Sequence, residues 1–116
     1  MMKKFFPLII GGILLGIAGN QGDCLAASEY DQGENVFKTK CIFCHGETGM
    51  GNGPAASSFG HPPANLTADK FWKGNAEKKI TDAVTKGYGS MPMMELGPDQ
   101  IKALIFYMSH TFKPRK

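Results

Sequence analysis

Three side chains that can hold a metal or a cofactor lie within five consecutive residues of the chain. They are Cys41, Cys44 and His45, in the stretch K-C-I-F-C-H-G. Two cysteines separated by two residues can form a redox-active disulfide, provide half of a zinc site or attach a haem covalently. The remainder of the chain must distinguish these three kinds of chemistry.

The other residues of the chain favour haem attachment. A thioredoxin-like dithiol belongs to a β-α-β pattern, and no segment here alternates apolar and polar residues as a strand does. A structural zinc site needs four ligands, usually as two close pairs, and the chain offers no second pair of cysteines or histidines. The pattern C-x-x-C-H is typical of c-type haem attachment. Cys41 and Cys44 would form thioethers with the haem vinyl groups, and His45 would bind the iron through Nε2.

The first part of the chain has the composition of a secretory signal peptide. Two lysines near its start precede 14 uncharged residues, 5–18, and a polar stretch then leads to small residues ending at Ala27. The uncharged run is shorter than the roughly 18 residues expected of a membrane span. We therefore expect residues 1–27 to be removed, and residues 28–116 to form one domain in the periplasm or an equivalent compartment outside the cytoplasm.

Cys24 lies in this leader, and we expect it to be removed with it. A lipid-modified cysteine would need Leu three residues before it and Gly or Ala directly before it, but these positions hold Gln21 and Asp23. Retention of Cys24 as a lipid anchor is the alternative. Cleavage after residue 27 removes two lysines and Asp23, so the formal net charge falls from +3 to +2. This small charge does not predict binding to nucleic acid.

Two helices are predicted on either side of a long loop. The first covers residues 29–40, with Ser28 as its N-cap and an apolar face that continues into the haem motif. The second covers residues 76–86, with Asn75 as its N-cap and Gly87 just beyond its C-terminal end. Each helix thus has a start signal, and the second also has a stop signal.

A third helix is predicted over residues 98–111. Pro98 suits the first helical turn, and Asp99 favours the positive end of the helix dipole. Residues 45–69, between the first two helices, are rich in Gly and Pro, and a loop this long indicates a function such as wrapping a large cofactor. Three short helices bury little apolar surface, so a haem would complete the core. The apolar face of the third helix consists of Ile101, Leu104, Ile105, Met108 and Phe112.

A haem iron has a sixth coordination position, and methionine fills it opposite histidine in many electron carriers. Met50 is too close to His45 in sequence to reach the opposite face of a haem. Met108 lies on the apolar face of the last predicted helix, where a core position is expected. The remaining candidates lie in the loop G-Y-G-S-M-P-M-M and are Met91, Met93 and Met94.

Together these segments resemble the class I cytochromes c, which are small monohaem electron carriers. The resemblance covers nearly all of residues 28–116 and rests on G-E-N-V-F-K-T-K-C-I-F-C-H-G, G-M-G-N-G-P-A-A, P-P-A-N-L-T, G-S-M-P and L-I-F-Y-M. It implies an all-α fold, with three main helices and long Gly/Pro loops around one covalently bound haem c. It also implies an electron-transfer protein rather than an enzyme.

The resemblance further implies roles for residues at the iron. The methionine of Met-Pro is the iron ligand in this family, which selects Met91. Met93 and Met94 remain alternatives, because small or aromatic residues usually follow Met-Pro. Pro54, in the Gly-Pro that follows the haem motif, would accept a hydrogen bond from His45 Nδ1–H through its carbonyl and make the imidazole a better iron ligand.

Two further expectations concern the packing around the haem. Gly33 and Phe37 of the first helix would meet Leu104 or Tyr107 of the last helix, as the corresponding residues do in the family. Trp72 would border the haem and reach a propionate, or else it would be an ordinary core residue.

We therefore expect an exported, monomeric one-electron shuttle without a membrane span after signal cleavage. Its redox partners would dock on an apolar rim near the haem edge. One alternative is a haem c subunit or module of an oxidase or dehydrogenase complex, and the other is a haem sensor or peroxidase-like protein with an open iron site. The expected rim consists of Ile42, Phe43, Met93 and Met94.

Overall fold

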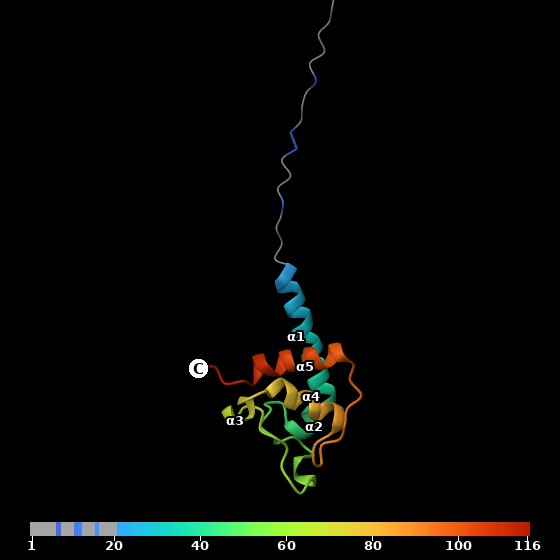
Figure 1. Cartoon of the computed structure of the whole chain (residues 1–116), viewed down its shortest axis with the longest axis vertical. Coiled ribbons are helices and arrows are strands. Elements are labelled where there is room, and N and C mark those ends of the chain that lie inside the picture. Colours follow the sequence, from blue (N-terminus) through green and yellow to red (C-terminus); the bar gives the residue numbers. More distant parts are fainter. Residues whose placement is uncertain (1–6, 8–10, 13–15, 17–20) are drawn as a thin grey trace, which may run out of the picture.

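The computed structural model of the chain describes Pro7, Gly11, Gly12, Gly16 and residues 21–116. Most of the predicted signal peptide, residues 1–27, therefore lies outside the described residues. The described part is helical, and its one β-bridge pairs Tyr88 with Met91, so the expected all-α fold is confirmed. The elements in chain order are α1 (Gln21–Lys40), α2 (Ile42–His45), η1 (Ala56–Ser58), α3 (Asp69–Trp72), α4 (Ala76–Lys86) and α5 (Pro98–Thr111) (Figure 1).

Helix α1 begins earlier than the sequence predicted. The helix was expected over residues 29–40 with Ser28 as its N-cap, but it already includes Gln21, so Ser28 lies inside the helix and does not cap it. Residues 21–27 include Leu and Ala, which are strong helix formers, and contain no proline. The described side chains from Cys24 to Ser28 are exposed, so this first part of α1 packs against nothing.

The crossing of α1 and α5 organises the domain (Figure 1). A Cβ atom at Gly33 would lie 1.9 Å from the carbonyl oxygen of Ala103 and 2.7 Å from Tyr107 Cβ, so the two helix backbones are in direct contact there. One turn later, the rings of Phe37 and Tyr107 lie 5.6 Å apart between centroids. The expected contact of Gly33 and Phe37 with the last helix is confirmed, and Tyr107 is the residue that makes it.

Helices α4 and α5 were predicted with the correct bounds. Asn75 Oδ1 accepts a hydrogen bond from the backbone N–H of Lys78 at 2.9 Å, which caps α4. Gly87, with φ +77°, ends the helix and donates its N–H to the Ala83 carbonyl at 2.9 Å. At the start of α5, the Gln100 side chain accepts from the backbone N–H of Gly97 at 2.9 Å.

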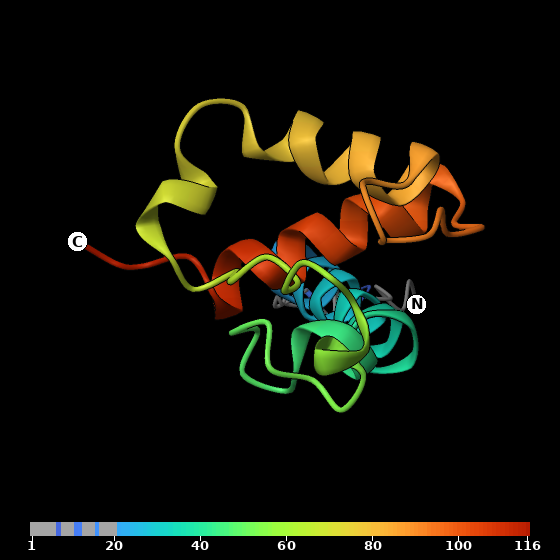
Figure 2. The same cartoon turned by 90° about the horizontal axis from the view of Figure 1, so that it is seen from below.

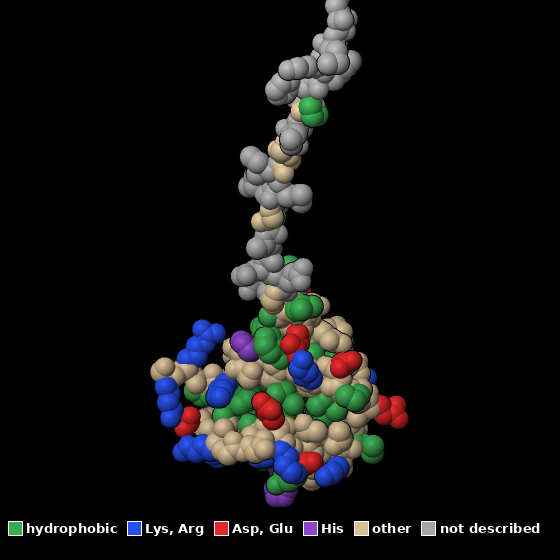
Figure 3. All heavy atoms as spheres, turned by 45° about the horizontal axis from the view of Figure 1, so that its top comes forward, with side chains coloured by type: hydrophobic (Ala, Val, Ile, Leu, Met, Phe, Trp, Pro, Cys, Tyr) green, Lys and Arg blue, Asp and Glu red, His purple; other side chains and the backbone are tan. Residues whose placement is uncertain are grey.

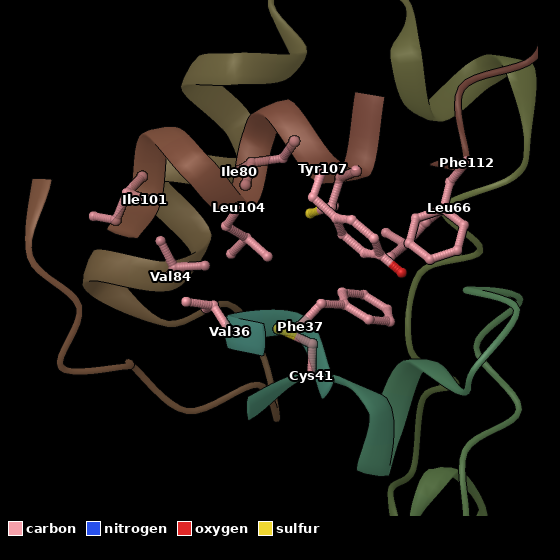
Figure 4. Packing of buried hydrophobic residues seen from close by; sticks show 11 residues of the cluster. Val36, Phe37, Cys41, Leu66, Ile80, Val84, Ile101, Leu104, Tyr107 and Phe112 are labelled. Atoms are coloured by element: carbon pink, nitrogen blue, oxygen red, sulfur yellow. The ribbon is translucent and has the colours of Figure 1, made fainter. Parts of the chain in front are cut away.

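The apolar core lies between α1, α4 and α5 (Figure 4). Phe37 and Leu104 are its most completely buried large side chains. Figure 2 shows α4 and α5 side by side, with the loop after α2 on the other side of α5. No helix within the described residues is long and apolar enough to cross a membrane. The buried cluster consists of Val36, Phe37, Cys41, Leu66, Ile80, Val84, Ile101, Leu104, Tyr107, Met108 and Phe112.

Candidate functional site

The haem motif occupies a single helical turn that continues directly from α1. The backbone N–H groups of Cys44 and His45 both donate to the Cys41 carbonyl, at 3.2 and 2.9 Å. Residues three and four apart lie on the same face of a helix, so the two thiols and the imidazole share one side of this turn. Gly46, with φ +80°, ends the turn. Cys41 is 8% exposed and belongs to the core cluster.

No disulfide joins the two cysteines of the motif. Burial, followed by the neighbouring Cys44, raises the pKa of the Cys41 thiol to about 12. Within the described residues, no three His, Cys, Asp or Glu side chains are grouped so that they could hold a metal ion. The described residues thus show neither the disulfide of an oxidised dithiol nor a second group of ligands for zinc.

The hydrogen bond of His45 shows which of its nitrogens is free. His45 Nδ1 lies 3.0 Å from the carbonyl oxygen of Ala64. A carbonyl oxygen can only accept, so Nδ1 carries the proton and the lone pair of Nε2 is available to a metal. Burial lowers the pKa of His45, and the bond to Ala64 opposes this effect only in part. The imidazole is therefore neutral, half-buried and suited to bind iron.

The expected role of Pro54 as the acceptor of this hydrogen bond is wrong. Pro54 is exposed, and its neighbours pair with α2 instead: Gly53 N–H donates to the Cys44 carbonyl at 3.0 Å and Ala55 N–H to the Phe43 carbonyl at 2.9 Å. These two bonds hold Pro54 along the backbone of α2, while the chain reaches His45 only after Pro62-Pro63. The acceptor is a main-chain atom of an alanine, which has no side-chain signal in the sequence.

The Trp72 indole binds a backbone carbonyl of the loop before α3. Its Nε1–H donates to the carbonyl oxygen of Leu66 at 2.7 Å, and the contact with a haem propionate stays a prediction. The indole is partly buried and packs against the core cluster. Trp72 is therefore a core residue that fixes the loop between Pro63 and α3.

The methionine loop is held firmly against α4. Tyr88 and Met91 exchange two backbone hydrogen bonds, of 3.0 and 2.9 Å, and Met94 N–H donates to the Val84 carbonyl at 2.7 Å. Met91 and Met94 are partly buried and pack against the core cluster, whereas Met93 is 63% exposed. Of the three methionines in this loop, Met93 therefore faces solvent, and Met91 and Met94 face the core.

The comparison with protein families gives a match over nearly all of the domain. The family model described as Cytochrome c matches residues 30–112. The chain belongs to the cytochrome c family. Members of this family carry haem c, attached covalently through a C-x-x-C-H motif, and Cys41 and Cys44 have this spacing. The cofactor of this cytochrome c is therefore haem c, and its function is electron transfer.

Two individual proteins extend the comparison. The cytochrome c is 38% identical over 81 residues to the Cbb3-type cytochrome c oxidase subunit FixP of Bradyrhizobium diazoefficiens. The match covers 66% of this chain and 26% of FixP. A chain of the reducing HAO-like protein complex of Kuenenia stuttgartiensis has a similar structure, with a TM-score of 0.58 and 31% identity. That match covers 72% of this chain and 44% of the other.

Proposed function

We propose that this cytochrome c is an exported one-electron carrier whose iron is ligated by His45 and Met91. The observation that carries this proposal is the hydrogen bond from His45 Nδ1 to Ala64, because it leaves Nε2 free on the same helical turn as both cysteines. Haem c would supply the change between Fe(II) and Fe(III). Cys41 and Cys44 would hold the ring in place.

Met91 is the best candidate for the second axial ligand. It is partly buried, and its backbone is fixed at both N–H and C=O by the bridge to Tyr88. Two protein ligands on the iron leave no open position for a substrate or for oxygen, so this arrangement suits electron transfer better than bond chemistry. Met94 faces the same core, and its backbone N–H and C=O are also bonded, to Val84 and Leu96, so the preference for Met91 rests on the Met-Pro sequence.

Substitution of the methionines one at a time tests this ligand set. Met91→Ala in the haem-loaded protein should abolish the absorption band of the Fe(III)–Met bond and let the ferrous protein bind carbon monoxide. Met93→Leu should change neither property, because its side chain is in solvent. If the band is lost in Met94→Leu and stays intact in Met91→Ala, Met94 rather than Met91 is the iron ligand. A wild-type protein that lacks the band and binds carbon monoxide rapidly would favour the open-site alternative.

Partner proteins would dock on the apolar rim made by Ile42, Phe43, Met93 and Met94. Phe43 and Met93 are 64% and 63% exposed and so accessible to a partner, whereas Ile42 and Met94 are partly buried behind them. Met93→Ser should slow oxidation of the protein by oxidase-containing membranes. Its oxidation by hexacyanoferrate(III), a small ion that needs no docking surface, should proceed at the wild-type rate. If the membranes oxidise Met93→Ser and the wild type at equal rates, Met93 does not take part in docking.

A module of a larger redox assembly is the second candidate. It is favoured by the similarity to an oxidase subunit and to a chain of an HAO-like complex, each longer than the matched region. Size-exclusion chromatography of solubilised membranes distinguishes the two roles. A free shuttle elutes alone, whereas a module elutes together with oxidase or dehydrogenase activity. Mass spectrometry of the same sample gives the mature N-terminus and tests the proposed removal of residues 1–27, and with it the loss of Cys24.

A further inference from the structure

The acceptor for His45 belongs to a short segment that is fastened at several points. We call residues 64–66 the strap. The carbonyl of Ala64 accepts from His45 Nδ1, and the N–H of Leu66 donates to the Gly49 carbonyl at 2.7 Å. The Leu66 side chain is 3% exposed and lies in the core cluster. The strap is thus joined to the loop that follows the haem motif, on one side, and to the core, on the other.

Trp72 completes the fixation of the strap. Its Nε1–H donates to the Leu66 carbonyl at 2.7 Å, so both backbone polar groups of Leu66 are bonded. The Leu66 N–H belongs to the peptide unit directly after the one that carries the Ala64 carbonyl, and the Leu66 carbonyl belongs to the next unit. Each unit is planar, so holding these two units leaves few dihedral angles free between them and Ala64. The bond from Trp72 thus restricts the part of the strap next to the Ala64 carbonyl.

Trp72 is itself held by the next helix. It ends α3, and the Lys79 ammonium of α4 donates to the backbone carbonyls of Phe71 and Lys73, on either side of the tryptophan, at 2.6 and 3.1 Å. Trp72 also contacts the Phe71 ring edge-on, with 5.2 Å between centroids. A continuous series of bonds thus leads from α4 through Trp72 and the strap to His45.

We propose that Trp72 is a positioning residue for His45, and that it acts through the strap rather than by touching the cofactor. This inference rests on the proposed role of His45 as an iron ligand. A hydrogen bond from Nδ1–H to a well-oriented carbonyl makes an imidazole a stronger donor to its metal. A stronger donor favours Fe(III) and lowers the reduction potential. Loss of the indole N–H should loosen the strap, weaken the bond to Ala64 and raise the potential.

Trp72→Phe in the haem-loaded protein tests the inference, because it removes the N–H and keeps an aromatic ring in the core. We expect the reduction potential to rise. We also expect the amide hydrogen of Leu66 and the Nδ1 hydrogen of His45 to exchange roughly 2- to 10-fold faster in NMR measurements, as loss of one hydrogen bond predicts. Phe71→Leu is the matched control: it removes the ring next to Trp72 but keeps the Trp72 Nε1–H bond to Leu66, so both readouts should move less than in Trp72→Phe.

The possible outcomes separate positioning from ordinary packing. If Trp72→Phe is destabilised like Phe71→Leu but keeps the wild-type potential and exchange rates, Trp72 only fills space and the inference fails. Should Trp72→Phe not fold, Asn65→Ala provides a second test. Asn65 belongs to the strap, and its side-chain oxygen accepts from Thr67 N–H and Oγ1 at 2.9 and 2.7 Å. Loss of these bonds should loosen the strap and move both readouts in the same direction as Trp72→Phe. Unmoved readouts in Asn65→Ala would then overturn the inference.

The same experiment distinguishes this inference from the proposed function. A wild-type spectrum without the signature of a histidine-ligated iron would contradict the role of His45 itself. A normal spectrum with an unchanged potential in the variants would contradict only the role of Trp72.

Discussion

At the residue scale, one backbone carbonyl decides the chemistry of His45. The proton is on Nδ1 because Ala64 can only accept, and the pKa of the imidazole is lowered by burial. The approach of the two chain segments depends on a glycine. A Cβ atom at Gly51 would lie 2.4 Å from the carbonyl oxygen of Pro63, the residue directly before the strap. Gly51 therefore allows the loop after the haem motif to come close to the segment that binds His45.

Gly51→Ala should cost more stability than a left-handed backbone conformation alone explains. Gly51 has φ +81° and Gly74 has φ +74°, but a Cβ atom at Gly74 would meet nothing within 4 Å. Gly74→Ala should therefore cost about 1–2 kcal/mol of unfolding free energy, the strain of the left-handed conformation. Gly51→Ala should cost about 1–3 kcal/mol more, because the new methyl group displaces the Pro63 carbonyl. Urea unfolding followed by haem absorption measures both, and equal losses would show that the contact with Pro63 is unimportant.

The spacing of Cys41, Cys44 and His45 predicted the haem motif from the sequence because side chains carry this chemistry. The acceptor of His45 could not be predicted in the same way, because every residue has a backbone carbonyl and only the path of the loop brings one to the imidazole. The indole N–H of Trp72 posed a similar problem. A tryptophan indicates a buried ring with one donor, and the partner of that donor is known only after folding.

At the element scale, the helices with their own end signals were predicted accurately. Asn75 and Gly87 delimit α4, and Pro98 starts α5. The first helix lacks such a limit, because the sequence before Ser28 is itself compatible with helix. The short helices α2 and α3 have four residues each, so they are too short to show helical periodicity and were not predicted.

The crossing of α1 and α5 gives a prediction in which two effects have opposite signs. In an exposed helix, Gly33→Ala would stabilise the protein by about 1 kcal/mol, because alanine is the better helix former. At this crossing the new Cβ would lie 1.9 Å from the Ala103 carbonyl oxygen, and backbone atoms cannot rotate away as a side chain can. Overpacking of this kind costs about 3 kcal/mol or more. The net result should be a loss of about 2 kcal/mol.

Thermal and urea unfolding of Gly33→Ala measure this balance. Gly60→Ala serves as the control, since a Cβ atom there would have no neighbour within 4 Å and its φ is not left-handed. Its unfolding free energy should stay close to that of the wild type. A Gly33→Ala protein that is as stable as the wild type would mean that α1 and α5 can separate without loss, and the crossing would not organise the domain as described.

At the scale of the whole molecule, the positive charges are unevenly placed. Helix α3 and the C-terminal tail lie on the same side of the molecule (Figure 1), and Figure 3 shows several Lys and Arg side chains gathered on this side. Lys113 lines one hollow of about 370 Å³ together with Trp72 and Gly74, which places the start of the tail beside α3. Lys38 and Lys102 lie elsewhere and form ion pairs with glutamates of α1, at 2.8 and 3.4 Å, and Lys73 of the α3 side forms a longer pair with Asp69, at 3.8 Å. The basic residues of the α3 side are Lys70, Lys73, Lys113, Arg115 and Lys116.

This asymmetry predicts that the rate at which the protein meets an anionic oxidant depends on where its positive charges lie and not only on its net charge. The double variant K70Q/K73Q and the control K38Q/K102Q each remove two positive charges, so their net charges are equal. Charges separated by more than about 10 Å are largely screened at 0.1 M ionic strength, whereas at low salt an oriented field steers charged reactants. Oxidation of the ferrous protein by hexacyanoferrate(III), followed by stopped flow, should therefore be slowed more by K70Q/K73Q than by K38Q/K102Q at low salt. The two variants should converge as salt is added, and an equal loss at every salt concentration would show that the α3 side does not guide acidic partners to the haem.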